Sequence, residues 1–318
     1  MKNGLLCVYK EAGWTSSDVV SKLRGIVRQK RIGHTGTLDP DAVGVLVICL
    51  GTATRLTEFL TDHDKEYIAV CKLGVTTDTQ DISGQVLEEK DASRIKKEEL
   101  LKAVQSFKGD YEQVPPMYSA LKVRGKKLYE LAREGKTVER KPRTVHIDAI
   151  TVLDLSDFQS DALFTMEVKC TRGTYIRTLC HDIGLSLGTG ACMAALTRTA
   201  VGSFRMEEAH TIAELQEKAN ANELDDVILP PDAVFKDYDK IIVKNAAHKY
   251  VQNGNALTFD VLCSEAPDNE TDVITDEDSY TEGTRVRVYD EDKLFYGIWK
   301  YSEKRKRFEC DLYLYAQE

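Results

Sequence analysis

The stretch Gly33-His34-Thr35-Gly36-Thr37-Leu38-Asp39-Pro40 lies between two segments of the chain that are expected to be buried. It holds two glycines, a histidine and a carboxylate, which is typical of a loop that must take one particular shape. It has neither of the glycine spacings that bind nucleotide phosphates, G-x-x-x-x-G-K-[ST] or G-x-G-x-x-G. Taken by itself, Asp39 is most simply explained as the start of an Asx-type turn ahead of Pro40, and a functional carboxylate is the alternative.

Regular structure is expected on both sides of this loop. Gly4 to Lys10 has the apolar content of a strand, and Ser16-Ser17-Asp18 can cap a helix whose apolar side chains recur at helical spacing. Val45 to Leu50 predicts a buried strand and Ala53 to Leu60 a helix. Further helices are expected at about 96–107, 126–133 and 174–187, further strands at 67–73, 146–155 and 162–170, and a polar connection at 74–84.

The pattern of expected elements changes after Leu229-Pro230-Pro231. From about Tyr238 the segments are short and strand-like, at 241–243, 285–289, 294–301 and 308–315. Between them, residues 265–282 contain eight acidic residues and no basic one, which predicts a solvated or disordered loop. The fold class predicted from these patterns is α+β with a small all-β module at the C-terminal end.

Length and composition indicate a soluble protein with a large and a small domain. The chain has 318 residues, of which 42% are hydrophobic, enough for a real core. Its eight cysteines form no C-x-x-C pair, which favours reduced, buried thiols in a cytosolic protein. The apolar run that ends at Tyr9 is too short for a signal peptide, and no run reaches the ~20 residues of a membrane helix. We therefore expect a cytoplasmic location.

Charge is distributed unevenly along the chain. The net charge of −9 argues against a nucleic-acid partner, and residues 201–318 carry 14 basic against 26 acidic residues. Residues 1–200, in contrast, carry 29 basic against 26 acidic residues, and 122–143 alone holds nine basic and three acidic ones. Affinity for a polyanion follows local cationic density rather than net charge. The sequence therefore predicts that any phosphate contact is made at 122–143.

The loop at 33–40, with Gly44-Val45-Leu46 behind it, closely resembles the active-site motif of the TruB-type pseudouridine synthases. One departure is that Val43 stands where the family usually has threonine, so any hydrogen bond of that hydroxyl is lost. The resemblance covers about residues 3–232 and continues, in family order, through Asp64-Lys65-Glu66-Tyr67, Thr77-Asp78-Thr79, Pro116-Met117-Tyr118-Ser119-Ala120-Leu121-Lys122, Gly125-Lys126-Lys127-Leu128-Tyr129 and Gly173-Thr174-Tyr175-Ile176-Arg177.

The resemblance implies a fold and a reaction. The fold is a mixed, mostly antiparallel sheet with flanking helices at 1–232, followed at 238–318 by a β-barrel-like module that resembles the RNA-binding PUA domain. The reaction converts the uridine at position 55, in the T-loop of tRNA, to pseudouridine without metal or cofactor. Asp39 would be the catalytic carboxylate, either as the nucleophile that attacks the sugar or as the base that removes a sugar proton. Arg177 would pair with it and favour its ionised form.

The resemblance also assigns residues that contact the substrate. Tyr67 would stack on the target uracil and help remove the proton from carbon 5, Leu196 would pack on the other side of the base, and His34 would hold the flipped nucleotide. Each has a simpler explanation, as a half-buried strand tyrosine, a core leucine and a histidine that bonds within its loop. Tyr175 and Lys65 lie in matching motifs and are expected to bind substrate as well.

A uridine inside a folded T-loop must be extruded before it can react, at an unstacking cost of about a few kcal/mol. A basic, mobile segment is suited to hold the RNA meanwhile, and residues 116–143, with Lys122, Lys126 and Lys127, are expected to form this clamp. The alternative explanation is a solvated charged helix and loop with no partner.

Three functions remain open: a stand-alone tRNA enzyme, the catalytic subunit of a guide-RNA-dependent rRNA enzyme, and a non-catalytic RNA-binding protein. Guide-dependent relatives typically have extra N-terminal sequence, whereas here the first strand is expected at Gly4. A non-catalytic protein is expected to have lost Asp39 or Arg177, and both are present. The sequence therefore favours a monomeric tRNA enzyme that needs no guide RNA, protein partner or membrane.

Overall fold

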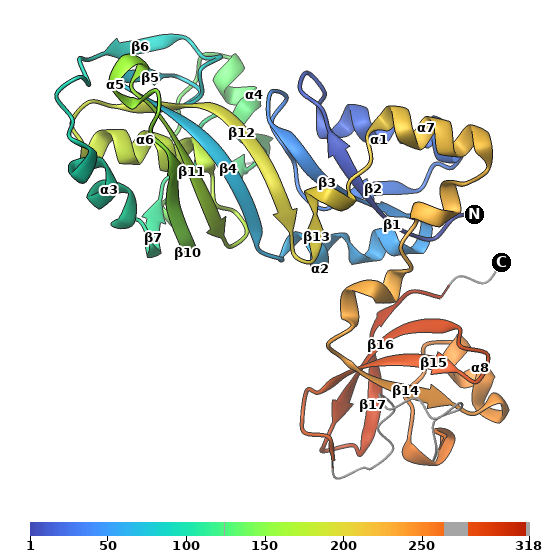
Figure 1. Ribbon diagram of the computed structural model, residues 1–318. Coiled ribbons are helices and arrows are strands. Elements are labelled where there is room, and N and C mark those ends of the chain that lie inside the picture. Colours follow the sequence, from blue (N-terminus) through green and yellow to red (C-terminus); the bar gives the residue numbers. More distant parts are fainter. Residues whose placement is uncertain (124, 264–278, 316–318) are drawn as a thin grey trace.

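The computed structural model describes residues 1–123, 125–263 and 279–315 (Figure 1). The strands before residue 206 are β1 (Gly4–Lys10), β2 (Ile32–His34), β3 (Val43–Leu50), β4 (Lys65–Leu73), β5 (Val75–Thr77), β6 (Val86–Glu89), β7 (Gly109–Gln113), β8 (Lys122–Val123), β9 (Lys126–Lys127), β10 (Arg143–Asp154), β11 (Leu163–Cys170), β12 (Ala191–Val201) and β13 (Phe204–Arg205). The helices before residue 236 are α1 (Ser16–Val27), η1 (Gly51–Leu56), α2 (Thr57–Thr61), α3 (Lys97–Gln105), α4 (Leu128–Arg133), α5 (Phe158–Asp161), α6 (Ile176–Ser186), η2 (Met206–Glu208), α7 (Ile212–Ala221), η3 (Leu224–Val227) and η4 (Pro231–Phe235), where η marks a 3-10 helix.

One long sheet forms the body of the molecule. In the described residues its strand order is β1-β3-β12-β4-β11-β10-β7, with β2 added to β3 and β13 to β12. These pairings are antiparallel except that of β12 with β3, where Thr197 pairs with Val43 and Arg198 with Gly44. The predicted class, a mixed and mostly antiparallel sheet with flanking helices, is thus confirmed.

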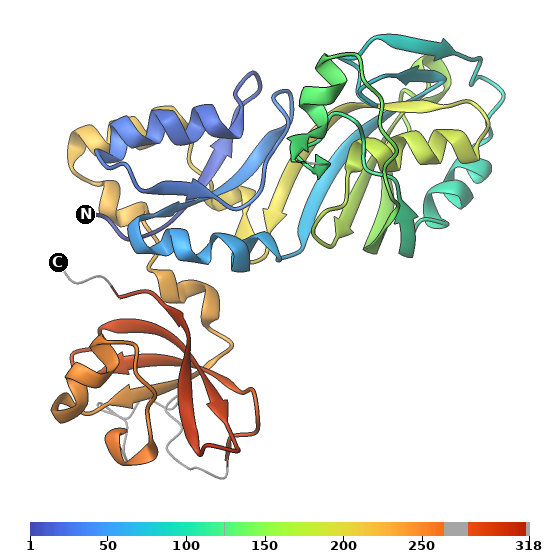
Figure 2. The ribbon, with the colours of Figure 1, turned by 180° about the vertical axis from the view of Figure 1, so that it is seen from behind.

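Side-chain alternation along the strands sends apolar residues to both faces of the sheet. Leu6 and Val8 of β1 face the amphipathic helices α1 and α7, whereas Leu5 and Cys7 join a second cluster with η1 and α2. At the other half of the sheet, α3 and α6 cover β4, β10, β11 and β12 (Figure 2). Burial on both faces explains why β1 and β3 have nearly continuous apolar sequences.

Most predicted elements are present, and several segments differ. The helix expected at 126–133 begins only at Leu128, after β9. The helix expected at 53–60 is divided into η1 and α2, and the segment expected to be a polar connection contains β5. The strand β12, central in the sheet, was not predicted at all. Its sequence, Ala-Cys-Met-Ala-Ala-Leu-Thr-Arg-Thr-Ala-Val, is poor in the residues that favour strands, so its conformation is decided by pairing with β4 and β3.

The C-terminal part contains β14 (Asp239–Val243), β15 (Arg285–Asp290), β16 (Phe295–Ser302), β17 (Arg307–Tyr313), η5 (Asn245–Ala247), α8 (His248–Gln252) and η6 (Phe259–Val261). The four strands form a sheet in this order, with β14 and β15 parallel. Bridges from Leu257 to Phe308 and from Leu262 to Val243 join the segment after α8 to both edge strands. Within the described residues the sheet does not close into the expected barrel, and most of the acidic loop expected at 265–282 lies outside them.

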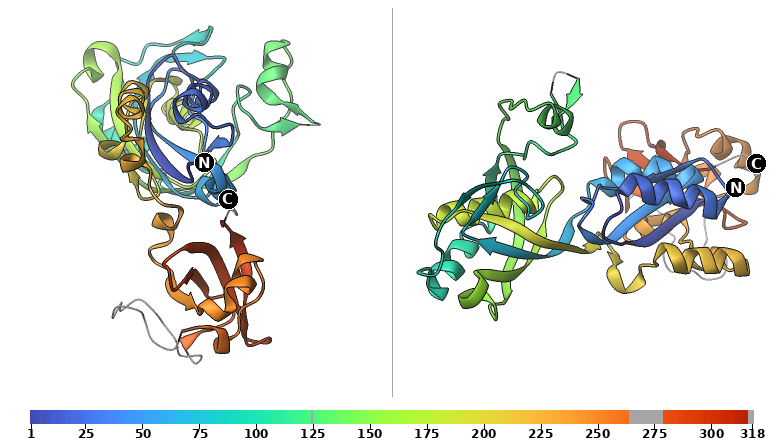
Figure 3. Two further views of the ribbon diagram at one scale, coloured as in Figure 1. Left: turned by 90° about the vertical axis from the view of Figure 1, so that its right-hand side faces the viewer. Right: turned by 90° about the horizontal axis from the view of Figure 1, so that it is seen from above.

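An apolar junction connects this part to the large sheet (Figure 3). The ring of Phe235 lies 4.8 Å from that of Phe59 and 6.5 Å from that of Phe295. At its rim the Tyr289 hydroxyl donates to Asp232 over 2.6 Å. The division of the chain at 232 and 238 stays a prediction, since Phe235 packs on both parts. In the described ranges, no helix is both long and apolar enough to cross a lipid bilayer.

Candidate active site

The loop that contains Asp39 connects β2 to β3 and is fixed at several points. The Leu38 N–H donates to Ser16 Oγ of α1 over 3.0 Å, and the Leu38 side chain is buried. The Ala42 N–H donates to the Asp39 carbonyl over 3.1 Å, which closes a tight turn with Pro40 at its second position. This is a backbone turn rather than the expected Asx-type turn, because the Asp39 carboxylate pairs with Arg177 instead.

The carboxylate of Asp39 forms a two-point ion pair with Arg177. Arg177 Nε lies 3.0 Å from Oδ2, and Nη2 lies 3.3 Å from Oδ1. The Arg177 side chain is 6% exposed and that of Asp39 is 39% exposed, so the guanidinium is enclosed while the carboxylate can still be reached from outside. Arg177 stands in the first turn of α6, far from Asp39 in sequence. The structure thus brings together the two residues that the sequence predicted to pair.

The other donors of Arg177 hold two more segments of the chain. Nη1 donates to the Thr79 carbonyl over 3.0 Å and lies 3.5 Å from an Asp81 carboxylate oxygen, and Nη2 donates to the Tyr118 carbonyl over 2.8 Å. Multiple hydrogen bonds offset the cost of burying a guanidinium. Asp81 was not singled out from the sequence, although it follows the matching motif Thr77-Asp78-Thr79 by two residues.

Opposing influences act on the pKa of the Asp39 carboxyl. Burial raises this pKa above its ordinary value, and the negative charges of Asp81 and Asp41 raise it further. Arg177 and Lys10 act in the opposite direction. Burial dominates, so the net direction is upward, and the two cations limit the rise and favour the ionised form.

Lys10 is a second buried cation at this loop. Its ammonium donates to the carbonyls of Trp14, Pro40 and Glu11 over 2.7, 2.9 and 3.0 Å. Burial lowers the pKa of Lys10 to about 8, even though Asp41 and Asp39 favour its charge. The sequence placed Lys10 only at the end of a strand, because a single lysine gives no sign of being buried.

Tyr67 and Leu196 lie in the same apolar cluster beside the loop, together with Leu38. Tyr67 is on β4 and Leu196 on the neighbouring strand β12, where Arg198 is the direct partner of Tyr67 in the register. Burial raises the pKa of the Tyr67 hydroxyl, while the positive charge of Arg198 lowers it. Tyr67 and Leu196 are thus two positions apart in the register of the neighbouring strands β4 and β12. They place an aromatic and an aliphatic side chain in one cluster near Asp39.

His34 and Tyr175 are both half-buried. His34 ends β2, and its Nδ1 accepts a hydrogen bond from the Gly36 N–H over 3.4 Å. Burial and the nearby Arg198 lower the pKa of His34, so its imidazole is neutral near pH 7. Tyr175 precedes α6, and its backbone exchanges two hydrogen bonds with the buried side chain of Gln113, over 2.7 and 3.0 Å.

The four predicted substrate-binding lysines lie in two different settings. Lys65 is buried, and its ammonium donates to the carbonyls of Thr61 and His63, both over 2.5 Å. Lys122, Lys126 and Lys127 belong instead to the β8–β9 hairpin, which with α4 stands out from the body of the molecule (Figure 3).

Within this hairpin the cations are only loosely held. Lys127 Nζ lies 3.3 Å from the Tyr129 hydroxyl and 5.4 Å from the centre of its ring. Lys126 is exposed and lies 3.5 Å from Glu134. Solvent screens such exposed pairs, so they contribute little and leave these cations available for a partner.

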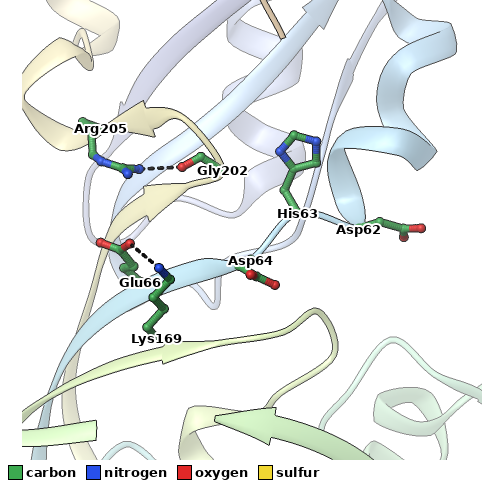
Figure 4. Close-up of a pocket in the computed structure, with 7 residues that line it drawn as sticks. All are labelled: Asp62, His63, Asp64, Glu66, Lys169, Gly202 and Arg205. Carbon is green, nitrogen blue, oxygen red and sulfur yellow. Dashed lines mark hydrogen bonds and ion pairs between the residues drawn. The ribbon is translucent and has the colours of Figure 1, made fainter. Parts of the chain in front are cut away.

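A separate polar cavity of about 370 Å³ lies near the start of β4 (Figure 4). Glu66 and Lys169 pair across it at 4.0 Å, and Arg205 donates to the Gly202 carbonyl over 2.5 Å. Glu66 precedes Tyr67 on the same strand, and successive strand residues face opposite sides of a sheet. The cavity therefore lies on the other face from Tyr67, and none of the predicted site residues lines it.

No group of His, Cys, Asp and Glu in the described parts of the chain has the arrangement of a metal site. The described cysteines are reduced, and six of them are buried. The chemical groups gathered at Asp39 include its reachable carboxylate, the enclosed guanidinium of Arg177, the buried ring of Tyr67 and the apolar side chains of Leu38 and Leu196.

Comparison with known proteins identifies the class to which this fold and site belong. Residues 24–176 match the model of the TruB family pseudouridylate synthase N-terminal domain, and residues 177–236 match the tRNA pseudouridylate synthase B C-terminal domain. A protein of Lachnoclostridium phytofermentans named tRNA pseudouridine synthase B is 45% identical over 96% of this chain and 98% of its own length. One of Alkaliphilus oremlandii with the same name is 48% identical over 82% and 84%. The chain belongs to the TruB family of pseudouridylate synthases, and it is an isomerase.

Solved structures agree on the fold. A chain of a Cbf5-Nop10-Gar1 complex is 25% identical, with a TM-score of 0.68 over 97% of this chain and 83% of that chain. A chain of an H/ACA RNP bound to a substrate RNA is 21% identical, with a TM-score of 0.69 over 99% and 86%. These likenesses concern the fold, while the family models and the relatives named above confirm the predicted family. The roles of individual residues stay predictions.

Proposed function

We propose that this chain isomerises a uridine in the T-loop of tRNA, at position 55, to pseudouridine, with Asp39 as the catalytic carboxylate. The observation that carries the proposal is the ion pair of Asp39 with Arg177, in which the carboxylate is accessible and the cation is not. The relatives named tRNA pseudouridine synthase B, which match most of this chain at 45% and 48% identity, support tRNA as the substrate.

The reaction is an exchange of one bond for another. The bond between N1 of uracil and C1′ of ribose breaks, the base turns, and a bond forms between C5 and C1′. N1 gains a proton and C5 loses one, so atoms and electrons balance without an oxidant or reductant. Asp39 acts either by attacking the sugar or by removing a sugar proton, and both roles require its ionised form. Arg177 favours this ionised form, because its positive charge lowers the pKa of the Asp39 carboxyl, which burial raises.

The apolar cluster beside Asp39 provides the binding surface for the flipped base. Tyr67 stacks on one face of the uracil and assists removal of the C5 proton, and Leu196 packs on the other face. His34, neutral because burial lowers its pKa, holds the flipped nucleotide by shape and hydrogen bonding rather than by proton transfer.

Cations outside the cluster bind the RNA backbone. The projecting segment at 116–143, with Lys122, Lys126 and Lys127, contacts phosphates around the T-arm. Tyr175 borders the substrate pocket, and Lys65 supports it indirectly, through the Thr61 and His63 carbonyls that its ammonium binds. The C-terminal part, 238–318, is proposed as a PUA-like RNA-binding module that extends the contact.

The proposed enzyme works alone, as a cytoplasmic monomer without guide RNA or partner protein. The test is to incubate it with an unmodified tRNA transcript and to map pseudouridine along the whole RNA by carbodiimide modification and primer extension. A transcript with cytidine at the target position is the matched control. We expect one pseudouridine, in the T-loop, and none in the control. Modification that appears only after a guide RNA is added, or elsewhere in the tRNA, would reject the proposal.

A further inference from the structure

Arg198, on β12, is among the largest fully buried side chains of the molecule, with an exposed fraction of 2%. Within the described residues it forms no ion pair with an aspartate or glutamate, unlike Arg177. Burying a guanidinium without a counter-charge costs folding free energy unless its N–H donors are hydrogen-bonded. We therefore expect Arg198 to have a specific role at its buried position.

The donors of Arg198 bind backbone carbonyls at both ends of the Asp39 loop. Nε donates to the Val45 carbonyl of β3 over 2.7 Å. Nη2 donates to the Gly36 carbonyl over 3.1 Å, and Nη1 lies 3.5 Å from the Thr37 carbonyl. The planar guanidinium therefore ties the segment just before Asp39 to the strand just after it.

The same residue also lies beside Tyr67. The positive charge of Arg198 lowers the pKa of the Tyr67 hydroxyl, against the effect of burial. The two residues are direct partners in the antiparallel register of β4 and β12. One side chain thus joins the loop of the carboxylate to the strand of the aromatic ring.

The backbone around Arg198 explains how it reaches this position. Arg198 pairs with Gly44 in the parallel contact of β12 with β3. Gly44 has a φ of 104°, and a Cβ there would lie 2.2 Å from the Arg198 carbonyl oxygen. Only glycine permits this approach, which brings the Arg198 side chain beneath the loop.

We propose that Arg198 is a positioning residue for the isomerisation, which sets the Asp39 carboxylate relative to the Tyr67 ring through the Gly36 and Thr37 carbonyls and through its pairing with Tyr67 across β12 and β4. This inference rests on the proposed function. Reaction rates depend steeply on such placement, and a shift of about 1 Å costs roughly 100-fold in rate. A merely structural arginine would instead affect stability, RNA affinity and rate together.

The test compares Arg198→Lys and Arg198→Ala with Arg205→Ala. Arg205 is a suitable control because it also donates to a backbone carbonyl, that of Gly202, but lies on β13 away from the loop. The measurements are the single-turnover rate of tritium release from C5-labelled tRNA at saturating enzyme, the Kd for the tRNA, and the melting temperature. The Arg198→Ala variant is also assayed with added guanidinium, and with urea as the uncharged control.

We expect both Arg198 variants to lose about 100-fold in rate while Kd stays within about threefold of wild type. Guanidinium, and not urea, should restore part of the rate of Arg198→Ala. A folded variant with the wild-type rate, parallel losses of rate, affinity and stability, or the unfolding of both variants would overturn the inference. If wild type and Arg205→Ala are inactive as well, the proposed function fails instead.

Discussion

Two groups of cations differ in how the molecule holds them. Lys10, Arg177 and Arg198 are buried around the Asp39 loop, and their donors bind carbonyls or carboxylates of the protein. Lys126 and Lys127 lie instead on a projecting hairpin, where, among the residues that the structure describes, their side chains contact Glu134 and Tyr129.

The difference shows how one chain can separate chemistry from binding. Buried charges act over short distances in a medium that screens them little, so they set geometry and protonation at the carboxylate. Exposed charges are screened by salt over about 10 Å, so they contribute to RNA affinity and to its dependence on ionic strength. Changes in the first group should alter turnover, and changes in the second should alter Kd.

Arg177→Ala is expected to have the largest effect. Removal of a preorganised charge at a reacting centre costs about 100- to 1,000-fold in turnover, and here Asp39 would also lose the cation that counteracts its raised pKa. The Kd for tRNA should remain nearly unchanged because Arg177 is enclosed. Arg172→Ala, which removes an exposed arginine bound to Asp62, is the control. Equal losses in turnover and affinity would show that Arg177 binds RNA.

The double variant Lys126→Glu with Lys127→Glu should weaken tRNA binding by roughly 10- to 100-fold at low salt, because two phosphate contacts become repulsive. Binding of the wild type should itself weaken steeply as salt is added. Turnover of the bound complex should change little. The control is Lys97→Glu with Lys102→Glu, on the exposed face of α3. Salt-insensitive binding by the wild type would rule out the electrostatic clamp.

The pH dependence of single-turnover rate tests the carboxylate. The pKa of Asp39 is raised, and its ionised form is required, so activity should be lost as pH falls through a value above that of an ordinary aspartate. Asp41→Asn removes one of the charges that raise this pKa, so the acidic limb of the pH profile should move to lower pH. A shift to higher pH would contradict this assignment.

Lys65→Met should have the smallest effect on the reaction. The Lys65 ammonium is occupied by two carbonyls, so the variant should lose about 1–3 kcal/mol of folding stability while Kd and turnover stay within about threefold. Thermal unfolding and single-turnover assays measure the two quantities. A large loss of affinity in a stable variant would mean that Lys65 leaves its carbonyls to bind substrate.

The sequence predicted the α+β class and most helices, because these depend on local patterns. Apolar alternation, the cap at Ser16 and the motif at 33–40 can each be read within a few residues. The loop and α6 are far apart in sequence, and their pairing was inferred from family resemblance rather than from spacing.

Features decided by tertiary packing were missed. Strand β12 has an alanine-rich sequence that gains its conformation only between β3 and β4. Lys10 and Arg198 look like surface residues in a sequence, since lysine and arginine are rarely buried unless they are paired. Their partners here are backbone carbonyls, which no side-chain pattern can reveal.

The most direct test of the account is release of tritium from carbon 5 of labelled uridine in an unmodified tRNA T-arm stem-loop, with wild type compared to Asp39→Asn and no guide RNA added. Asparagine keeps the shape of the side chain and removes its charge. We predict release by the wild type alone, while both proteins bind the RNA with similar Kd. Release by Asp39→Asn at the wild-type rate, or by neither protein although the RNA is bound, would contradict the account.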